Sequence, residues 1–93
     1  MTEKLLKTVE KIIEEFNKRG YDIAEDVVEL IESREDVAAK LEETKFKNIE
    51  FFNVDEENSV GFTLDDMQVN FFVEYGEDEE GKWYEASVEI INF

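Results

Sequence analysis

The chain has 93 residues, of which 42% are hydrophobic and 13% aromatic, a net charge of −16, and neither histidine nor cysteine. This length gives one domain, residues 1–93, with a single modest core, and the apolar content is high enough for folding despite the charge. The charge excludes nucleic acid and anionic membrane as favoured partners, because both are themselves negative.

The sequence also indicates where the protein resides. No apolar run reaches the roughly 18 residues that a membrane-spanning helix needs, and the first segment is too charged for a signal-peptide core. A small secreted domain would often need disulfides, which a chain without cysteine cannot form. We therefore expect a cytoplasmic protein.

The negative charge is concentrated in the second half of the chain. Residues 1–45 contain 13 acidic and 8 basic side chains, whereas residues 46–93 contain 13 acidic and only two basic ones, Lys47 and Lys82. Self-repulsion of this size opposes a compact state. A basic protein surface is the kind of partner that would relieve it.

Helical spacing of apolar residues predicts two or three helices between residues 2 and 44. In the first helix, Thr2 is the expected N-cap, and Gly20 is the expected glycine just past the C-terminus. The apolar stripe of this helix comprises Leu5, Leu6, Val9, Ile12, Ile13 and Phe16.

A second helix is expected from Asp22, which with Glu25 resembles a capping box. A break near Ser33, which with Asp36 resembles another capping signal, would start a third helix. The inward-facing residues are Ile23, Val27, Leu30 and Ile31 in the second helix and Val37, Ala38 and Leu41 in the third. The outer side of the second helix carries an acidic ridge, formed by Asp22, Glu25, Asp26, Glu29 and Glu32.

From residue 46 to 92, apolar residues alternate with period two, which predicts four strands. The strands are residues 46–54, 60–64, 67–75 and 82–92, joined by turns at 55–58 and 65–66 and by a loop at 76–81. Because the connections are short, successive strands should pair antiparallel as a meander. The predicted fold is α+β, with the helices packed on one face of a four-stranded antiparallel sheet.

The alternation assigns a core face and an outer face to this sheet. The expected core residues are Ile49, Phe51, Met67, Val69, Phe71, Val73, Tyr75, Tyr84, Ala86, Val88 and Ile90. The outer face is expected to present carboxylates around the aromatic side chains of Phe52, Phe72 and Trp83. Charge that steers encounter, combined with aromatic anchors, is typical of a protein-binding face, although the same aromatics could complete a second small core.

The residue types argue against an enzyme. Without histidine and cysteine there is no imidazole base, no thiolate nucleophile and no ordinary zinc site. No phosphate-binding glycine motif is present, and the acidic turns at 55–58 and 77–80 lack the spacing of a calcium-binding loop. We expect no catalysis, no cofactor and no bound metal.

In size, charge, absence of histidine and cysteine, and the acidic stretches DEEN, LDD and GEDEEG, the chain resembles small acidic phage-type inhibitors that mimic DNA, such as anti-CRISPR and anti-restriction proteins. The resemblance covers the whole chain and rests on composition alone. It implies an inhibitor, in the host cytoplasm if phage-encoded, that occupies the basic nucleic-acid-binding surface of a nuclease, a CRISPR effector or a nucleoid protein. The expected partner-binding residues are Glu50, Asp55, Glu56, Glu57, Asp65, Asp66, Glu74, Glu77, Asp78, Glu79, Glu80, Glu85, Glu89, Phe52, Phe72 and Trp83.

Alternative functions use the same electrostatics. An immunity or antitoxin protein that neutralises a basic toxin would also need an acidic surface, and a homodimeric interaction module would use the outer sheet face for self-association. The acidic ridge from Asp22 to Glu32 could form the binding face in place of the sheet and its turns.

Overall fold

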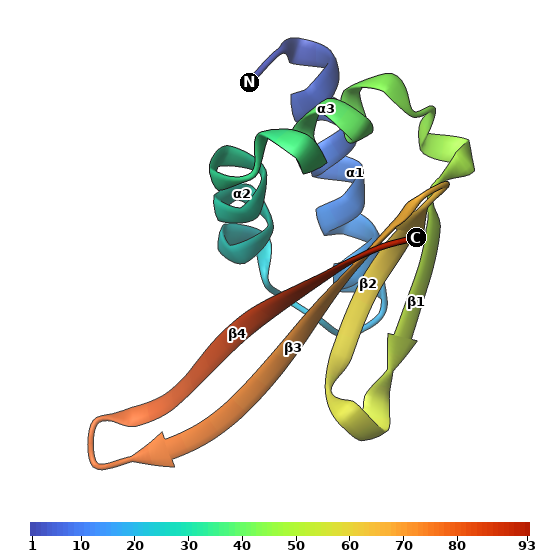
Figure 1. Ribbon diagram of the computed structural model, residues 1–93. Coiled ribbons are helices and arrows are strands. Elements are labelled where there is room, and N and C mark those ends of the chain that lie inside the picture. The colour runs from blue at the N-terminus through green and yellow to red at the C-terminus, as the bar shows by residue number, and fades with distance from the viewer. The chain divides into compact units, whose positions relative to one another are not determined.

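The computed structural model describes residues 1–93 and has three helices followed by a four-stranded sheet, which is the predicted α+β arrangement (Figure 1). The chain divides into two compact units, residues 1–50 and residues 51–93. The helices are α1 (Glu3–Lys18), α2 (Ala24–Ser33) and α3 (Glu35–Glu43), and the strands are β1 (Glu50–Val54), β2 (Ser59–Leu64), β3 (Met67–Asp78) and β4 (Gly81–Asn92). Single 3₁₀ turns form η1 (Phe46–Asn48) and η2 (Asp55–Glu57).

Helix α1 begins and ends as its sequence predicts. The Thr2 hydroxyl accepts a hydrogen bond from the Leu5 N–H at 3.1 Å, and Gly20 has a φ of +93° just past the C-terminus. The buried stripe is narrower than expected, because Leu6 is exposed and Ile13 is only half-buried. Its fully buried members are Leu5, Val9, Ile12 and Phe16.

The break between α2 and α3 is present, but the predicted capping boxes are wrong. The N-caps are Ile23 and Arg34, and neither makes a side-chain capping bond. Ile23 is almost fully buried, so burial of an apolar side chain fixes the start of α2 and leaves Asp22 one residue outside the cap. At the second junction, the Ser33 hydroxyl donates back to the Leu30 carbonyl at 3.2 Å and does not cap α3.

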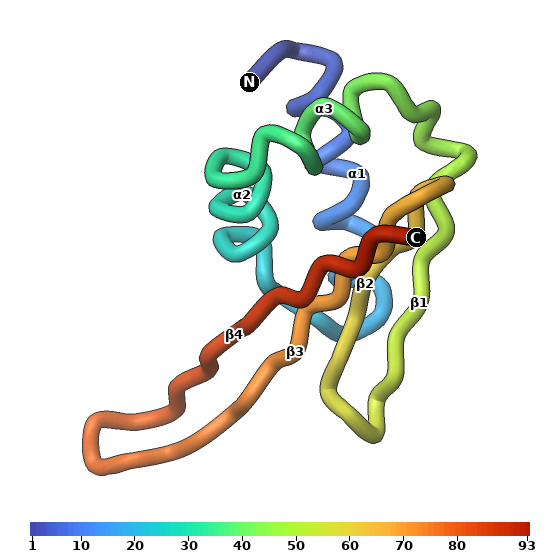
Figure 2. Tube along the Cα trace, in the orientation of Figure 1, coloured from blue at the N-terminus to red at the C-terminus, as the bar shows by residue number.

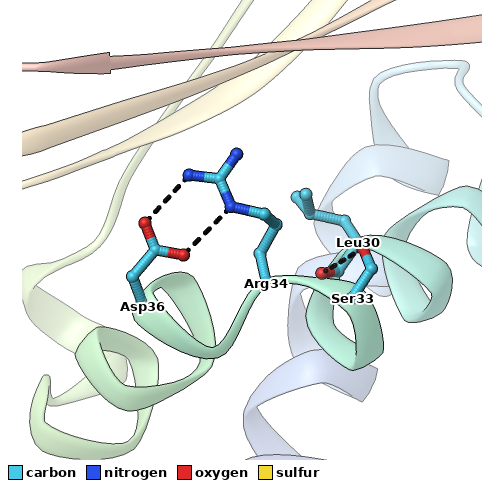
Figure 3. A network of polar contacts seen from close by, with 4 residues as sticks. All are labelled: Leu30, Ser33, Arg34 and Asp36. Atoms are coloured by element: carbon cyan, nitrogen blue, oxygen red, sulfur yellow. Dashed lines mark hydrogen bonds and ion pairs between the residues drawn. The ribbon is translucent and has the colours of Figure 1, made fainter.

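Asp36 is engaged by Arg34 at this junction (Figure 3). The guanidinium donates from Nε and Nη2 to the two carboxylate oxygens at 3.1 and 2.9 Å, a bidentate geometry. The hydrogen bond from Arg34 lowers the pKa of Asp36. The stabilisation from this pair is therefore present above the ordinary carboxyl pKa and is lost as the pH falls through the lowered one.

The sheet has the order β1-β2-β3-β4, so it is a meander. β2 pairs antiparallel with β3 from Leu64↔Met67 to Ser59↔Phe72, and β3 pairs antiparallel with β4 from Met67↔Asn92 to Asp78↔Gly81. One face of the β2–β3 pair is buried throughout. Its side chains are Val60, Phe62, Leu64, Met67, Val69, Phe71 and Val73.

Two strand boundaries differ from those predicted. Residues Phe46–Asn48 form η1, so β1 begins only at Glu50. The predicted loop at 76–81 is mostly strand, because the β3–β4 ladder continues to Asp78↔Gly81 and leaves a connection of only Glu79 and Glu80. The alternation of apolar residues does not predict this extension of β3 and β4, because its residues are mostly acidic. A strand with no buried face needs no apolar alternation.

Gly61 in β2, which pairs with Asn70, lies against the backbone of β3. A Cβ atom added at Gly61 would lie 2.1 Å from the Val69 carbonyl oxygen and 2.8 Å from the Phe52 ring. Backbone cannot move aside in the middle of a ladder, so only glycine fits here.

We expect Gly61→Ala to lower the free energy of unfolding by roughly 1–3 kcal/mol, the usual cost of overpacking. Gly76→Ala is the matched control, because its added Cβ would meet only the Trp83 side chain, which is partly exposed and can move; its cost should stay near 0.5 kcal/mol. Urea denaturation of both variants measures the difference. Equal losses would contradict the close approach at Gly61.

Candidate protein-binding surface

The longest unsupported element of the second unit is a hairpin arm, residues 74–85, formed by the distal halves of β3 and β4. The pairing of β2 with β3 ends at Ser59↔Phe72, whereas β3 and β4 remain paired to Asp78↔Gly81 (Figure 2). The Val73 N–H still donates to the Asn58 carbonyl at 2.8 Å, and the five strand residues beyond Val73 correspond to about 17 Å. The arm is therefore two-stranded, without a neighbour from β2.

The tip of the arm is a defined turn. The Glu80 N–H donates to the Asp78 carboxylate at 2.9 Å, and Gly81 has a φ of +121°, which a side chain would disfavour. This turn holds the exposed residues Glu79 and Glu80 between the ends of the ladder. The tip thus presents a fixed group of carboxylates, made of Glu77, Asp78, Glu79 and Glu80.

Carboxylates also line the outer face of the sheet, at positions set by the register. Glu74 and Glu85 are direct cross-strand partners, which brings their Cβ atoms to about 5 Å. Glu89 faces Asn70 and lies four residues from Glu85, or about 13 Å along the strand. Like charges opposite each other are destabilising, so the Glu74–Glu85 pair costs the free protein stability.

The predicted aromatic residues lie on this same face, and two of them cover glycines. The Trp83 indole lies over Gly76, its cross-strand partner, and the Phe52 ring lies over Gly61. Phe72, half-buried, lies between Ser59 on β2 and Ser87 on β4. Trp83 is 44% exposed and is therefore the most accessible anchor of the three.

The opposite face of the arm is also aromatic, which was not predicted. Tyr75 and Tyr84 are cross-strand partners and are 61% and 44% exposed, and Val88 is 43% exposed. The expectation that these three residues are core is wrong. They lie on the same sheet face as the buried residues of β3, but Tyr75 and Tyr84 lie beyond the end of β2, and Val88 lies on the edge strand β4. The sequence signal that could have identified them is the run of acidic residues that follows Tyr75.

The remaining predicted acidic residues fall into separate places. Asp55, Glu56 and Glu57 form η2, at the end of the sheet toward which the arm projects, and the Asn53 amide donates to Asp55 at 2.8 Å. Asp65 and Asp66 lie at the other end, about 35 Å along β3 from the arm tip. Glu50 is exposed at the start of β1 and belongs to the first unit. The predicted set is thus not one patch.

The acidic ridge of the first unit lies along α2. Asp22, Glu25, Glu29 and Glu32 are exposed, whereas Asp26 is half-buried. The ridge carries no basic side chain before Arg34. It lacks exposed aromatic residues, which distinguishes it from the arm.

No group of three or more acidic side chains is arranged to hold a metal ion. None of the helices is both long enough and apolar enough to cross a membrane. Comparison with protein-family models, with curated proteins and with solved structures finds no match to this chain.

We expect Glu85→Lys to raise the free energy of unfolding by about 0.5 kcal/mol at low ionic strength, because it replaces a like-charge cross-strand pair with an opposite-charge pair. Glu89→Lys, which changes the net charge equally but faces Asn70, is the control and should gain less. Thermal unfolding in dilute buffer and in about 1 M salt tests this, since salt should remove the difference. Equal stabilisation by both variants would show that only net charge matters.

Proposed function

We propose that this protein is an inhibitor that acts by occupancy, without turnover, and that it binds the basic nucleic-acid-binding surface of a target protein. The observation that carries the proposal is the charge of the second unit. Residues 51–93 contain twelve carboxylates and a single basic residue, Lys82. A surface of one sign attracts a partner of the opposite sign at long range and discourages others.

The arm and the outer face supply the proposed contacts. Their carboxylates are carried by a hydrogen-bonded ladder, so the backbone loses little conformational freedom when they bind a partner. Spacings of about 5 Å across the strands and about 7 Å between alternate residues along a strand give a dense array of negative charge. A DNA-binding protein holds Lys and Arg side chains that release counterions when they meet such an array.

Trp83 and Phe72 provide the apolar part of the proposed contact. Charged rims chiefly affect the rate and selectivity of association, whereas buried aromatic side chains account for most of the affinity at protein interfaces. Trp83 is flanked on β4 by Lys82 and Tyr84 and lies on the same face as Glu74 and Glu85. The arm therefore combines both requirements within a few residues.

A second candidate function is neutralisation of a basic toxin, as by an immunity or antitoxin protein. It is favoured by the exposed Tyr75–Tyr84 pair, because a surface that imitates only phosphates has no use for tyrosine rings. The two functions differ in one measurable property. A DNA mimic competes with DNA for its target, whereas a toxin-neutralising protein need not.

The first experiment is a pull-down from a bacterial lysate, with this protein as bait and washes of increasing salt. We expect a nucleic-acid-binding protein to be retained at low salt and displaced both by high salt and by added duplex DNA. A retained basic partner that ignores DNA would support the toxin-neutralising function. If no basic protein is retained at any salt concentration, both proposed functions are refuted.

The second experiment locates the binding surface on the captured target. We expect the triple variant Glu77→Lys, Glu79→Lys and Glu80→Lys to weaken binding by roughly 100-fold, as three favourable charge contacts become unfavourable. Asp78 is left intact because it holds the turn. The matched control reverses three exposed ridge residues, with Asp22→Lys, Glu29→Lys and Glu32→Lys, and should bind nearly as well as the parent. The reverse outcome would assign binding to α2.

A further inference from the structure

β4 is an edge strand, and its outer edge is long and uncovered by another strand. It stands last in the order β1-β2-β3-β4, spans Gly81–Asn92, and none of its residues is buried. The other edge, β1, has only five residues and lies between two 3₁₀ turns. An unpaired strand edge offers N–H and C=O groups to any extended chain of suitable side-chain pattern.

The hydrogen bonds of the sheet identify the groups at that edge. Phe93 donates its N–H to the Asp66 carbonyl at 2.9 Å, which continues the β3–β4 ladder by one pair. In an antiparallel ladder, residues alternate between pointing their backbone groups at the partner strand and pointing them away. The groups that point to the free edge are therefore those of even-numbered residues, among them Lys82, Ala86, Val88 and Ile90.

This edge has few of the features by which proteins protect an edge strand. The register with β3 runs from Met67↔Asn92 to Asp78↔Gly81 without a bulge, and the chain contains no proline. A single lysine, Lys82, lies at its start. Glu85 and Glu89 add negative charge to the strand, and that charge excludes only some partners.

The side chains of β4 define which partner fits. Glu85 and Glu89 lie on one face and Tyr84 and Val88 on the other, with the last two exposed. An added strand would place alternate residues beside each face. Basic residues suit the first face and apolar residues suit the second.

A second copy of this chain fits poorly. Antiparallel self-pairing of β4 centred on Ser87 would set Glu85 of one copy against Glu89 of the other, and two chains of net charge −16 repel each other. Charge complementarity thus selects a different occupant.

We infer that β4 accepts an extended basic segment of the partner protein as a fifth strand, in which Lys or Arg alternates with apolar residues. This inference rests on the proposed function, since it supplies the basic partner, and it specifies how that partner is held. Backbone hydrogen bonds along the edge provide affinity, and the alternating side chains provide selectivity. The affinity would then depend on the order of residues in the segment as well as on the salt concentration.

The test uses the full-length protein and an eight-residue peptide of alternating lysine and valine with blocked ends. Amide hydrogen exchange of β4, followed by NMR, is the readout. In the free protein the amides of Ala86 and Val88 should exchange fast and those of Glu85 and Ser87 slowly. Saturating peptide should slow exchange of the Ala86 and Val88 amides by roughly tenfold or more, because they become hydrogen-bonded. A peptide with the same residues in two blocks keeps the charge and should not protect them.

N-methylation of the peptide separates strand addition from simple charge attraction. In an antiparallel addition with valine opposite the even-numbered residues, methylation of the valine nitrogens should weaken binding at least about tenfold, and methylation of the lysine nitrogens should not. Equal effects of the two methylated peptides, equal protection by the block peptide, or no protection by any peptide would overturn the inference. Dimerisation of the protein through β4, seen by sedimentation with protection of Ala86 and Val88 in the absence of peptide, would overturn it as well.

These outcomes are independent of the proposed function. If the target is captured and displaced by DNA while β4 gains no protection, the inhibitor function stands and the fifth strand is refuted. If the peptide binds the edge but no nucleic-acid-binding target is found, the edge is a docking site for another basic protein and the DNA-mimic function fails.

Discussion

The unequal lengths of β2 and β3 determine most of what is particular about the second unit. β3 has 12 residues and β2 has six. β3 therefore has two neighbouring strands, β2 and β4, over its first half, and only β4 over its second half. Where β3 has two neighbours, one face is buried and its side chains are apolar. Where it has one, both faces are open, and carboxylates and exposed aromatic residues take over.

The electrostatic cost of this arrangement falls on the free protein. Glu74 and Glu85 face each other directly, and the carboxylates at the arm tip follow one another without an intervening base. The buried residues of β2 and β3 contribute the apolar stabilisation that offsets the repulsion. A basic partner would remove the repulsion on binding, so part of the binding free energy would come from relief of strain already present.

Much of the fold follows from the sequence, because periodicity reports burial. The apolar stripe of α1, apart from Leu6 and Ile13, the break near Ser33 and the period-two core of β3 as far as Val73 were predictable and are confirmed. The caps of α2 and α3 were not, because burial of Ile23 and the pairing of Arg34 with Asp36 outweigh side-chain capping. The exposure of Tyr75 and Tyr84 depends on where β2 ends, and that of Val88 on its place in the edge strand β4; no local pattern in β3 or β4 encodes either. For the surface, the residue types could be predicted but not their division between the two ends of the sheet.

The location of the chromophores has a practical consequence. The chain has one tryptophan and three tyrosines, and Trp83, Tyr75 and Tyr84 all lie on the hairpin arm, while Tyr21 is buried in the first unit. The large aromatic residues of the sheet's buried face are phenylalanines, which absorb and emit weakly. Ultraviolet absorbance and intrinsic emission therefore report mainly on the arm. Label-free spectroscopy can therefore follow changes in the environment of the arm, because the rest of the molecule contributes little to the signal.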